Sequence, residues 1–282
     1  MNLFKTIKLV LDEQFAEIDE DVETRVVTVK AALKYLSAGY ASLVIKNNLS
    51  YANPAVRFAY IFKYVTSHSD MTYQGIGQYS KALRSLFNRK IVQVSCIGGG
   101  PGSDLLGVLK YAEQVLKMED SKLKQIRCYL IDGENAWADA WSDVDQKVGL
   151  KCSVSTFFLC MKVTEPSQWK LHSKYLAADL FTMVYFVSEI YAMREEAEPF
   201  FVNLLASMKL GACLLFVDNN DSRFKDWISG LADAAGLKLV SEDDGEKCMG
   251  YDEQKSDLGE YMDLFGSPKI RGNATFRVWR KI

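Results

Sequence analysis

The segment Val92–Gly107, with the sequence VQVSCIGGGPGSDLLG, constrains the fold of this 282-residue chain more than any other part. A short apolar run ends there at a turn containing four glycines, and an apolar, helix-like run begins at Asp104. A buried strand, a tight loop and a helix have this pattern. Glycine lets a ligand approach the bare backbone, and a helix start presents unpaired N–H groups. The segment therefore predicts a site for a nucleotide-like cofactor.

Composition is that of a globular protein, since 49% of the residues are hydrophobic and 25% are charged. No apolar run approaches the roughly 20 residues that span a bilayer, and the N-terminus lacks the apolar core of a signal peptide. The six cysteines form no CxxC pair, and the only histidines are His68 and His172. We therefore expect reduced thiols in a cytoplasmic or nuclear protein, with no disulfide frame, metal site or membrane segment.

Charge is distributed unevenly along the chain. Residues 25–90 carry ten Lys and Arg against one acid, a net charge of +9, whereas residues 1–24 carry two lysines against seven acids. The basic block is also rich in Tyr and Phe. Basic side chains between aromatic rings are suited to phosphates and stacked bases, so the block is a candidate RNA-binding segment. The alternative is that the rings belong to a helix core and the lysines to its solvated face.

Residues 1–90 are predicted to be mostly helical. Asp21 or Thr28 begins one helix that ends near Gly39, and Asn53-Pro54 is a helix start signal for a second helix that reaches about residue 67. A third helix is expected over 73–87, although two glycines weaken its start.

Strands and helices alternate after residue 90, which is typical of a parallel sheet covered by helices on both faces. The chain is accordingly expected to divide into a helical cap over residues 1–90 and an α/β domain over 91–282. The expected strands are 91–97, 125–131, 152–163, 180–187, 212–217, 237–241 and 274–280. The expected helices are 104–118, 136–148, 196–208 and 223–235.

Two classes of cofactor use a glycine loop after the first strand. A dinucleotide fold needs G-x-G-x-x-G, and here Ser103 occupies the third glycine position, where it would crowd helix–strand packing. The spacing G-x-G-x-G is complete, and Asp132 ends the second strand. With the closing strand at the C-terminus, this pattern resembles the class I, Rossmann-like, S-adenosylmethionine (SAM) dependent methyltransferases over about residues 91–282. The glycine run is also similar to that of eukaryotic proteins related to fungal ribosomal-RNA uridine methyltransferases.

The resemblance implies a seven-stranded α/β sheet with an N-terminal helical cap, SAM as cofactor and S-adenosylhomocysteine as product. Asp132 would hold the ribose, and Trp137 either flanks the adenine or packs its helix on the sheet. Asp104 is either a cofactor contact or a helix cap. The segment 163–165 follows the strand whose end helps to hold adenine in this family. The cofactor-binding residues implied are Gly98, Gly99, Gly100, Gly102, Asp104, Asp132, Gly133 and Ser188.

The methyl acceptor is less constrained by the sequence. The fourth strand is followed by Ser188-Glu189-Ile190 in place of the Asn/Asp-Pro-Pro-Tyr motif of the family members that methylate base amines. Glu189 is the candidate catalytic residue, as a base or an orienting group, with binding of the SAM ammonium or helix capping as alternatives. Arg57 and Lys63 are candidate phosphate or carboxylate contacts. RNA is the preferred acceptor, and a small molecule, a protein or a non-catalytic SAM-binding role are the alternatives.

Overall fold

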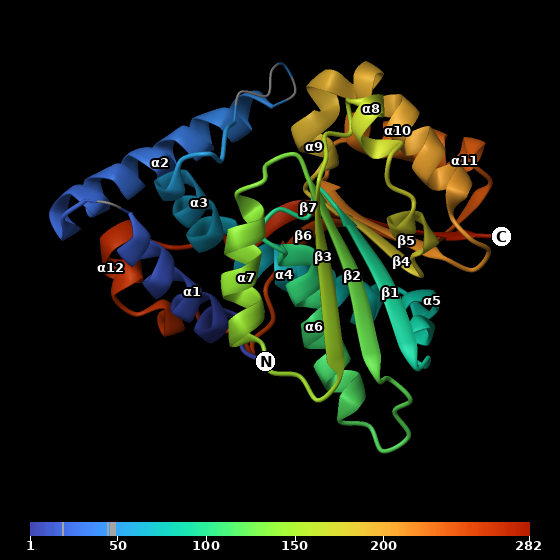
Figure 1. The fold of residues 1–282 in the computed structure, drawn as a ribbon, viewed down its shortest axis with the longest axis horizontal. Helices are drawn as coiled ribbons and strands as arrows, with labels where there is room; N and C mark the ends of the chain where they lie inside the picture. The colour runs from blue at the N-terminus through green and yellow to red at the C-terminus, as the bar shows by residue number, and fades with distance from the viewer. Residues whose placement is uncertain (19, 44, 46–48) are drawn as a thin grey trace.

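The computed structural model describes residues 1–18, 20–43, 45 and 49–282. Its centre is a seven-stranded sheet in the order β3-β2-β1-β4-β5-β7-β6 (Figure 1). β7 runs antiparallel to both β5 and β6, while β1 to β5 pair in parallel. The predicted seven-stranded sheet is therefore confirmed, and its closing strand β7 is reversed. The strands are β1 (Ile91–Ile97), β2 (Gln125–Asp132), β3 (Ser153–Cys160), β4 (Leu180–Val184), β5 (Cys213–Asn219), β6 (Leu237–Cys248) and β7 (Arg271–Lys281).

Helices cover both faces of the sheet because its central strands are apolar on both sides. In β5, Leu215 packs into the hydrophobic cluster that contains α6, while Leu214 and Phe216 pack into the cluster that contains α10 and α11. Side chains alternate between the two faces of a strand, so both faces need cover. The covering helices are α6 (Ser103–Leu116) and α7 (Trp137–Lys147) on one face, and α8 (Pro166–Trp169), α10 (Arg194–Ser207) and α11 (Ser222–Ala234) on the other. Short turns at η3 (Lys174–Ala177), α9 (Val187–Ile190) and η4 (Tyr191–Met193) connect them.

The N-terminal residues form the expected helices, with one correction. The predicted helices over 53–67 and 73–87 are instead one continuous helix from Pro54 to Tyr79, broken at the extended residue Ser80. The helix continues through Gly75, where the lack of a side chain lets the backbone lie close to the sheet. A Cβ at this position would lie 3.1 Å from a methyl group of Leu215. The elements are α1 (Leu3–Glu17), α2 (Val22–Ser42), α3 (Pro54–Tyr60), the π-helical turn η1 (Ile61–Val65), α4 (Thr66–Gln74), the π-helical turn η2 (Gly75–Tyr79) and α5 (Lys81–Leu86).

Part of the C-terminal region joins these N-terminal helices. The turn η5 (Lys255–Leu258) and α12 (Glu260–Phe265) lie beside α1 and α2, at the opposite end of the sequence (Figure 1). Tyr261 and Phe265 pack their rings on Phe15 and Phe58 of the N-terminal helices. The hydrophobic cluster they enter also contains strand residues, so the cap and one face of the sheet share a core. The division of the chain at residue 90 stays a prediction.

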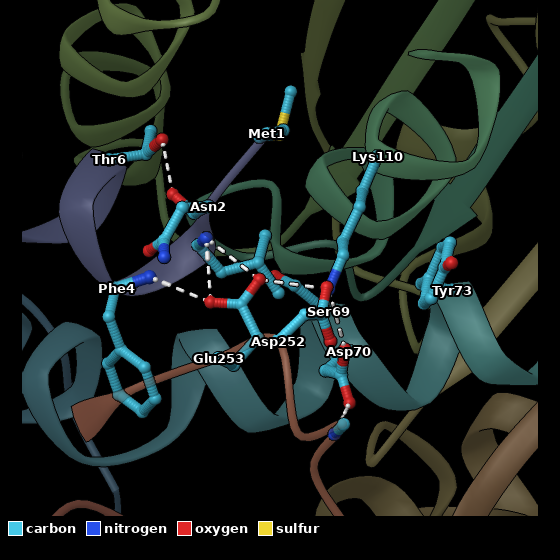
Figure 2. Close-up of polar contacts among 12 residues, drawn as sticks. Met1, Asn2, Phe4, Thr6, Ser69, Asp70, Tyr73, Lys110, Asp252 and Glu253 are labelled. Atoms are coloured by element: carbon cyan, nitrogen blue, oxygen red, sulfur yellow. Dashed lines mark hydrogen bonds and ion pairs between the residues drawn. The ribbon is translucent and has the colours of Figure 1, made fainter. Parts of the chain in front are cut away.

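A buried ionic cluster ties the N-terminus to the sheet domain (Figure 2). Lys110 of α6 is 5% exposed, and its Nζ lies 3.1 Å from Asp70 of α4 and 2.9 Å from Glu253. Glu253 also accepts hydrogen bonds from the backbone N–H groups of Leu3 and Phe4, at the start of α1. The carboxylate therefore compensates both the lysine and the unpaired donors of a helix N-terminus.

The predicted end of the strand over 237–241 is wrong, because β6 continues to Cys248 through a charged stretch. Asp244 accepts hydrogen bonds from both terminal nitrogens of Arg277 and from the hydroxyl of Thr275 on the neighbouring β7. Cross-strand pairing of opposite charges supports a strand whose composition alone disfavours one. β7 begins three residues earlier than predicted as its partner.

Candidate functional site

The loop after β1 needs glycine at three positions. Gly98, Gly100 and Gly102 all have positive φ, at 67°, 50° and 86°, which L side chains rarely adopt. A Cβ on Gly98 would lie 2.0 Å from the ring of Phe186, and one on Gly102 would lie 2.1 Å from the ring of Trp141. These two glycines therefore serve packing as well as backbone geometry.

Gly100 is the glycine of this loop that is open to a ligand. A Cβ built on it would meet nothing nearer than 3.9 Å, where the indole nitrogen of Trp137 lies. Gly99 instead donates its N–H to the carbonyl of Ile131 and is buried against the strands. Of the four predicted loop glycines, Gly98 and Gly100 line a cavity, and Gly99 and Gly102 support the loop from behind.

That cavity, here the β1–β4 cavity, has a volume of about 450 Å³ and lies where β1, β2, β3 and β4 end. Tyr51, in the loop before α3, and Tyr60 of α3 also contribute to its wall. From β1 the chain adds β2 and β3 on one side of the sheet and then crosses to add β4 and β5 on the other side. Open α/β sheets bind their ligands at this point of strand-order reversal, and the cavity lies there. The wall from the sheet side comprises Gly98, Gly100, Ile131, Asp132, Gly133, Glu134, Met161, Lys162, Val163, Thr164, Glu165, Val184, Tyr185, Phe186, Glu189 and Ile190.

Asp132 is held at the end of β2 by backbone donors. Its Oδ2 accepts the N–H of Gly100 at 3.0 Å, and its Oδ1 accepts the N–H of Glu134 at 2.9 Å. Burial raises the pKa of this carboxyl to about 6, although the backbone hydrogen bonds oppose that rise. Each carboxylate oxygen keeps a second lone pair, so the group can still accept hydrogen bonds from a ligand in the β1–β4 cavity.

Asp104 does not line the β1–β4 cavity, although the sequence made it a candidate cofactor contact. Its fully buried carboxylate accepts a 2.7 Å hydrogen bond from the hydroxyl of Thr182 on β4, and a longer one from Ser103. Burial raises the pKa of Asp104 to about 7. Asp104 lies in the first turn of α6, where its side chain makes no cap hydrogen bond, and it ties that turn to β4 through Thr182.

Three aromatic rings join the N-terminal helices to the loop after β2. The ring of Trp137 lies with its centroid 5.0 Å from that of Tyr51 and 5.4 Å from that of Tyr60. Trp137 is 2% exposed and lines the β1–β4 cavity. Trp137 therefore packs against the N-terminal region and lines the cavity, and its contact with adenine stays a prediction.

The end of β4 departs from the predicted strand over 180–187. β4 ends at Val184, because Tyr185 adopts a φ of 54° and the chain then turns into α9. Positive φ is uncommon for a bulky residue and marks local backbone strain. Its N–H is still held by the carbonyl of Val217, at 2.7 Å.

Glu189 lies in the wall of the β1–β4 cavity, beside two tyrosines from the N-terminal region. The hydroxyl of Tyr40 donates to its Oε1 at 3.0 Å, and that of Tyr51 at 3.5 Å. Burial raises the pKa of Glu189 to about 8, and the charges of Asp132 and Asp218 contribute to that rise. Glu189 and Asp132 thus line one cavity, and their predicted catalytic and ribose-binding roles stay predictions.

Ser188 lies apart from the β1–β4 cavity. It lines a second space of about 360 Å³, here the β4–β5 cavity, together with Tyr185 and Asn219 from the ends of β4 and β5. Its N–H donates to Asp218 at 2.9 Å. The other residues of this wall are Tyr40, Leu43, Lys63, Tyr64, His68 and Lys269.

The two basic candidates of the N-terminal segment are engaged within the protein. Arg57 donates from one nitrogen to the carbonyls of Tyr51 and Ala52, at 2.9 and 2.8 Å, and so holds the loop before α3. Lys63 donates to the carbonyl of Ser267 and lines the β4–β5 cavity. Sequence reasoning missed His68 and Lys269, because they come from a helix interior and from a loop 200 residues further along the chain.

Comparison with known proteins shows similarity in structure only. No protein-family model matches the sequence, and no curated protein matches it. An O-methyltransferase family protein from Burkholderia thailandensis superposes with a TM-score of 0.51 at 14% identity, over 90% of this chain and 71% of that one. The fold is that of the class I methyltransferases. A candidate RNA methyltransferase from Pyrococcus horikoshii gives a TM-score of 0.45 at 13% identity, over 89% of this chain and 99% of that one. A SAM-dependent methyltransferase from Methanosarcina mazei gives a TM-score of 0.46 at 10% identity, over 72% of this chain and 98% of that one.

Among the described residues, no three or more His, Cys, Asp or Glu side chains are grouped so as to hold a metal ion. Within those residues, too, no helix combines the length and the apolar character needed to cross a membrane.

Proposed function

We propose that this protein is a SAM-dependent methyltransferase whose cofactor binds in the β1–β4 cavity. The observation that carries the proposal is the meeting of the Asp132 carboxylate and the open backbone of Gly100 in one cavity at the strand-order reversal. A carboxylate there accepts hydrogen bonds from sugar hydroxyls, and a glycine without neighbours lets a ligand approach the main chain.

The residues of this cavity fit the chemistry of such a cofactor. Its volume lies in the range of small-molecule sites, roughly 300–1,000 Å³. The loop after β3, from Met161 to Glu165, and the ring of Trp137 form a wall for a planar base. Glu189 offers a carboxyl to an amino group. When bound, the cofactor supplies a methyl group carried on a positively charged sulfur.

A dinucleotide cofactor fits less well. Ser103 stands where a dinucleotide fold has its third glycine, and its buried hydroxyl is directed to Asp104. The reversed β7 between β5 and β6 also departs from the strand order 3-2-1-4-5-6 of the dinucleotide-binding fold. Both features favour SAM over NAD.

The protein's contribution to methyl transfer would be alignment and exclusion of water. Tyr51, Tyr60 and Trp137 pack against one another over the cavity and connect the N-terminal helices to the loop after β2. Glu189 is fixed by Tyr40 and Tyr51 on the cavity wall. Because Glu189 lines the β1–β4 cavity and is absent from the wall of the β4–β5 cavity, we assign it an orienting role toward the cofactor's amino end.

RNA, the acceptor predicted from the sequence, stays one candidate. The net charge of +9 over residues 25–90 supports it. Several of those cations are engaged within the protein, however: Arg57 with loop carbonyls, Lys63 with Ser267 and Arg89 with Asp179. A small acceptor that enters beneath the N-terminal helices is the candidate that these contacts favour. If the protein binds RNA with an affinity that falls steeply as salt is added, RNA would be favoured over a small acceptor.

The test is binding of S-adenosylhomocysteine to Asp132→Ala and Asp132→Asn variants, followed by thermal shift and calorimetry. We expect at least about a tenfold loss of affinity, since hydrogen bonds to a charged group contribute about 1.5–3 kcal/mol. Asp139→Ala, at an exposed position on α7, is the matched control and should bind like the wild type. Unchanged affinity of folded Asp132 variants would refute the proposed site.

A non-catalytic SAM-binding role is separated from catalysis by a second measurement. Transfer of label from methyl-labelled SAM to RNA or to a small-molecule extract identifies an enzyme and its acceptor class together. Binding of SAM with no transfer to either would support the sensor role.

A further inference from the structure

We propose that the β4–β5 cavity is the acceptor site and that it is built for an aromatic acid, a planar ring bearing a carboxylate. This inference rests on the proposed function, because only a bound methyl donor makes the neighbouring cavity an acceptor site. Tyr185 lines both cavities, so a ligand in one lies next to a ligand in the other.

The first observation is a buried histidine without hydrogen-bond partners. His68 is 3% exposed, and neither of its ring nitrogens has a partner among the described residues. Buried polar groups are nearly always hydrogen-bonded, so an unpartnered ring on a cavity wall points to a ligand. Its ring stacks on Tyr185 with centroids 4.2 Å apart and an interplanar angle of 15°, so its orientation is fixed.

The second observation is positive charge without a matching carboxylate on the wall. Lys63 and Lys269 both line the β4–β5 cavity, and no Asp or Glu does so among the described residues. The Lys269 ammonium lies 4.3 Å over the ring of Tyr185, and among the described residues no carboxylate lies within ion-pair distance of it. Asp218 lies behind the wall, where its oxygens accept the N–H groups of Ser188 and Asn219 and its charge acts on Lys269. The two ammonium groups on the wall itself therefore favour an anion in the cavity.

The third observation is the aromatic wall. Tyr40, Tyr64, His68 and Tyr185 surround the cavity, and the rings of Tyr40 and Tyr64 meet edge to face at 5.1 Å. A volume of about 360 Å³ admits one small ring system. Aromatic rings favour stacked or edge-on contacts with another ring, and the two lysines then meet its acid group.

His68 serves this site as a hydrogen-bonding group rather than as a base. Burial and the charge of Lys269 lower the pKa of His68 well below its ordinary value, so the ring is neutral. A neutral imidazole has one donor and one acceptor nitrogen, which suits a polar substituent on the acceptor ring.

The chain offers a direct test, because His68 and His172 are its only histidines. NMR of the full-length protein with isotope-labelled histidine rings gives one signal set from the buried His68 and one from the exposed His172, which serves as internal control. The probes are para-hydroxybenzoate, its neutral analogue para-hydroxybenzamide, and uridine monophosphate. Each is titrated with the protein alone and with the protein saturated with S-adenosylhomocysteine.

We expect para-hydroxybenzoate to shift the His68 signals and leave those of His172 in place. The amide should bind at least about tenfold more weakly, because it cannot pair with the lysines. Lys269→Met should weaken the benzoate by a similar factor, whereas Lys238→Met, at an exposed position on β6, should not.

Three results would overturn the inference. They are a silent His68 at millimolar benzoate, equal affinity for the acid and the amide, and a His68 shift with uridine monophosphate alone, which would point to a nucleotide. SAM binding with a silent His68 would refute the acceptor site alone. A His68 response in a protein that fails to bind SAM or S-adenosylhomocysteine would refute the proposed function, and with it the acceptor role, and would leave the β4–β5 cavity as a binding site for an aromatic acid.

Discussion

The wild-type protein is expected to lose stability as the pH rises, and the Glu189→Gln variant is predicted to lose much less. Burial raises the pKa of Glu189 to about 8 from an ordinary 4.5. The folded protein therefore binds this proton more tightly than the unfolded chain does. Its contribution to stability is fully present below pH 4.5, falls as the pH rises through that window and is lost above about pH 8.

The size of the effect follows from that window. One pKa unit corresponds to 1.36 kcal/mol, so going from about pH 5 to about pH 7 costs about 2.5 kcal/mol through this carboxyl. A chain of this size loses about 2 °C in Tm per kcal/mol, which makes the difference about 5 °C. Glutamine has the shape of the protonated acid but does not titrate. Its amide oxygen can still accept the hydrogen bond from the hydroxyl of Tyr40.

The assay is the Tm of wild type and Glu189→Gln across this pH range. Burial also raises the pKa values of Asp104 to about 7 and of Asp132 and Asp218 to about 6. These groups lower stability in both proteins as the pH rises, so the difference between the two curves reports on Glu189 together with its interaction with Asp132 and Asp218. Glu196→Gln, at an exposed position on α10, should follow the wild type. Parallel curves for wild type and Glu189→Gln would refute the reasoning.

Three further changes test the packing around the site. Lys110→Met leaves the buried carboxylates of the ionic cluster without their cation and should cost about 3–5 kcal/mol in urea unfolding, whereas Lys117→Met, exposed on the same helix, should cost under about 0.5 kcal/mol. Gly98→Ala forces a Cβ against Phe186 at positive φ and should lower Tm by an amount equivalent to about 2–4 kcal/mol. Gly230→Ala, with open space in a helix, should instead raise Tm slightly. A Gly98→Ala protein as stable as wild type would contradict the loop geometry.

The sheet could be predicted from the sequence because its signals are local. The apolar run, the glycines and the following helix are contiguous around β1, and the predicted bounds of β1 match the structure. The ends of β4 and β6 could not be predicted in this way. Strain at Tyr185 ends β4, and pairing of Asp244 with Arg277 extends β6, and both depend on neighbours far along the chain.

The residues of the candidate site likewise fall into those that a local motif predicts and those that only the fold brings together. Asp132 follows a glycine loop at a familiar spacing, and it lies in the β1–β4 cavity as expected. The β4–β5 cavity brings together His68, Tyr185 and Lys269, which are more than 80 residues apart in every pair. No short motif links them. Only the fold shows that His68 and Lys269, which among the described residues have no hydrogen-bond partner and no ion pair respectively, line the same space.

The central claim, that the β1–β4 cavity holds SAM, is tested most directly by calorimetric titration of the full-length protein with SAM, S-adenosylhomocysteine and NAD. Micromolar binding of the first two, with no heat from NAD, is the result that the glycine spacing, Asp132 and the reversed β7 predict. Binding of NAD alone would contradict it and would mean that Ser103 does not exclude a dinucleotide. Binding of none of the three would contradict it as well and would favour a scaffold role for the fold.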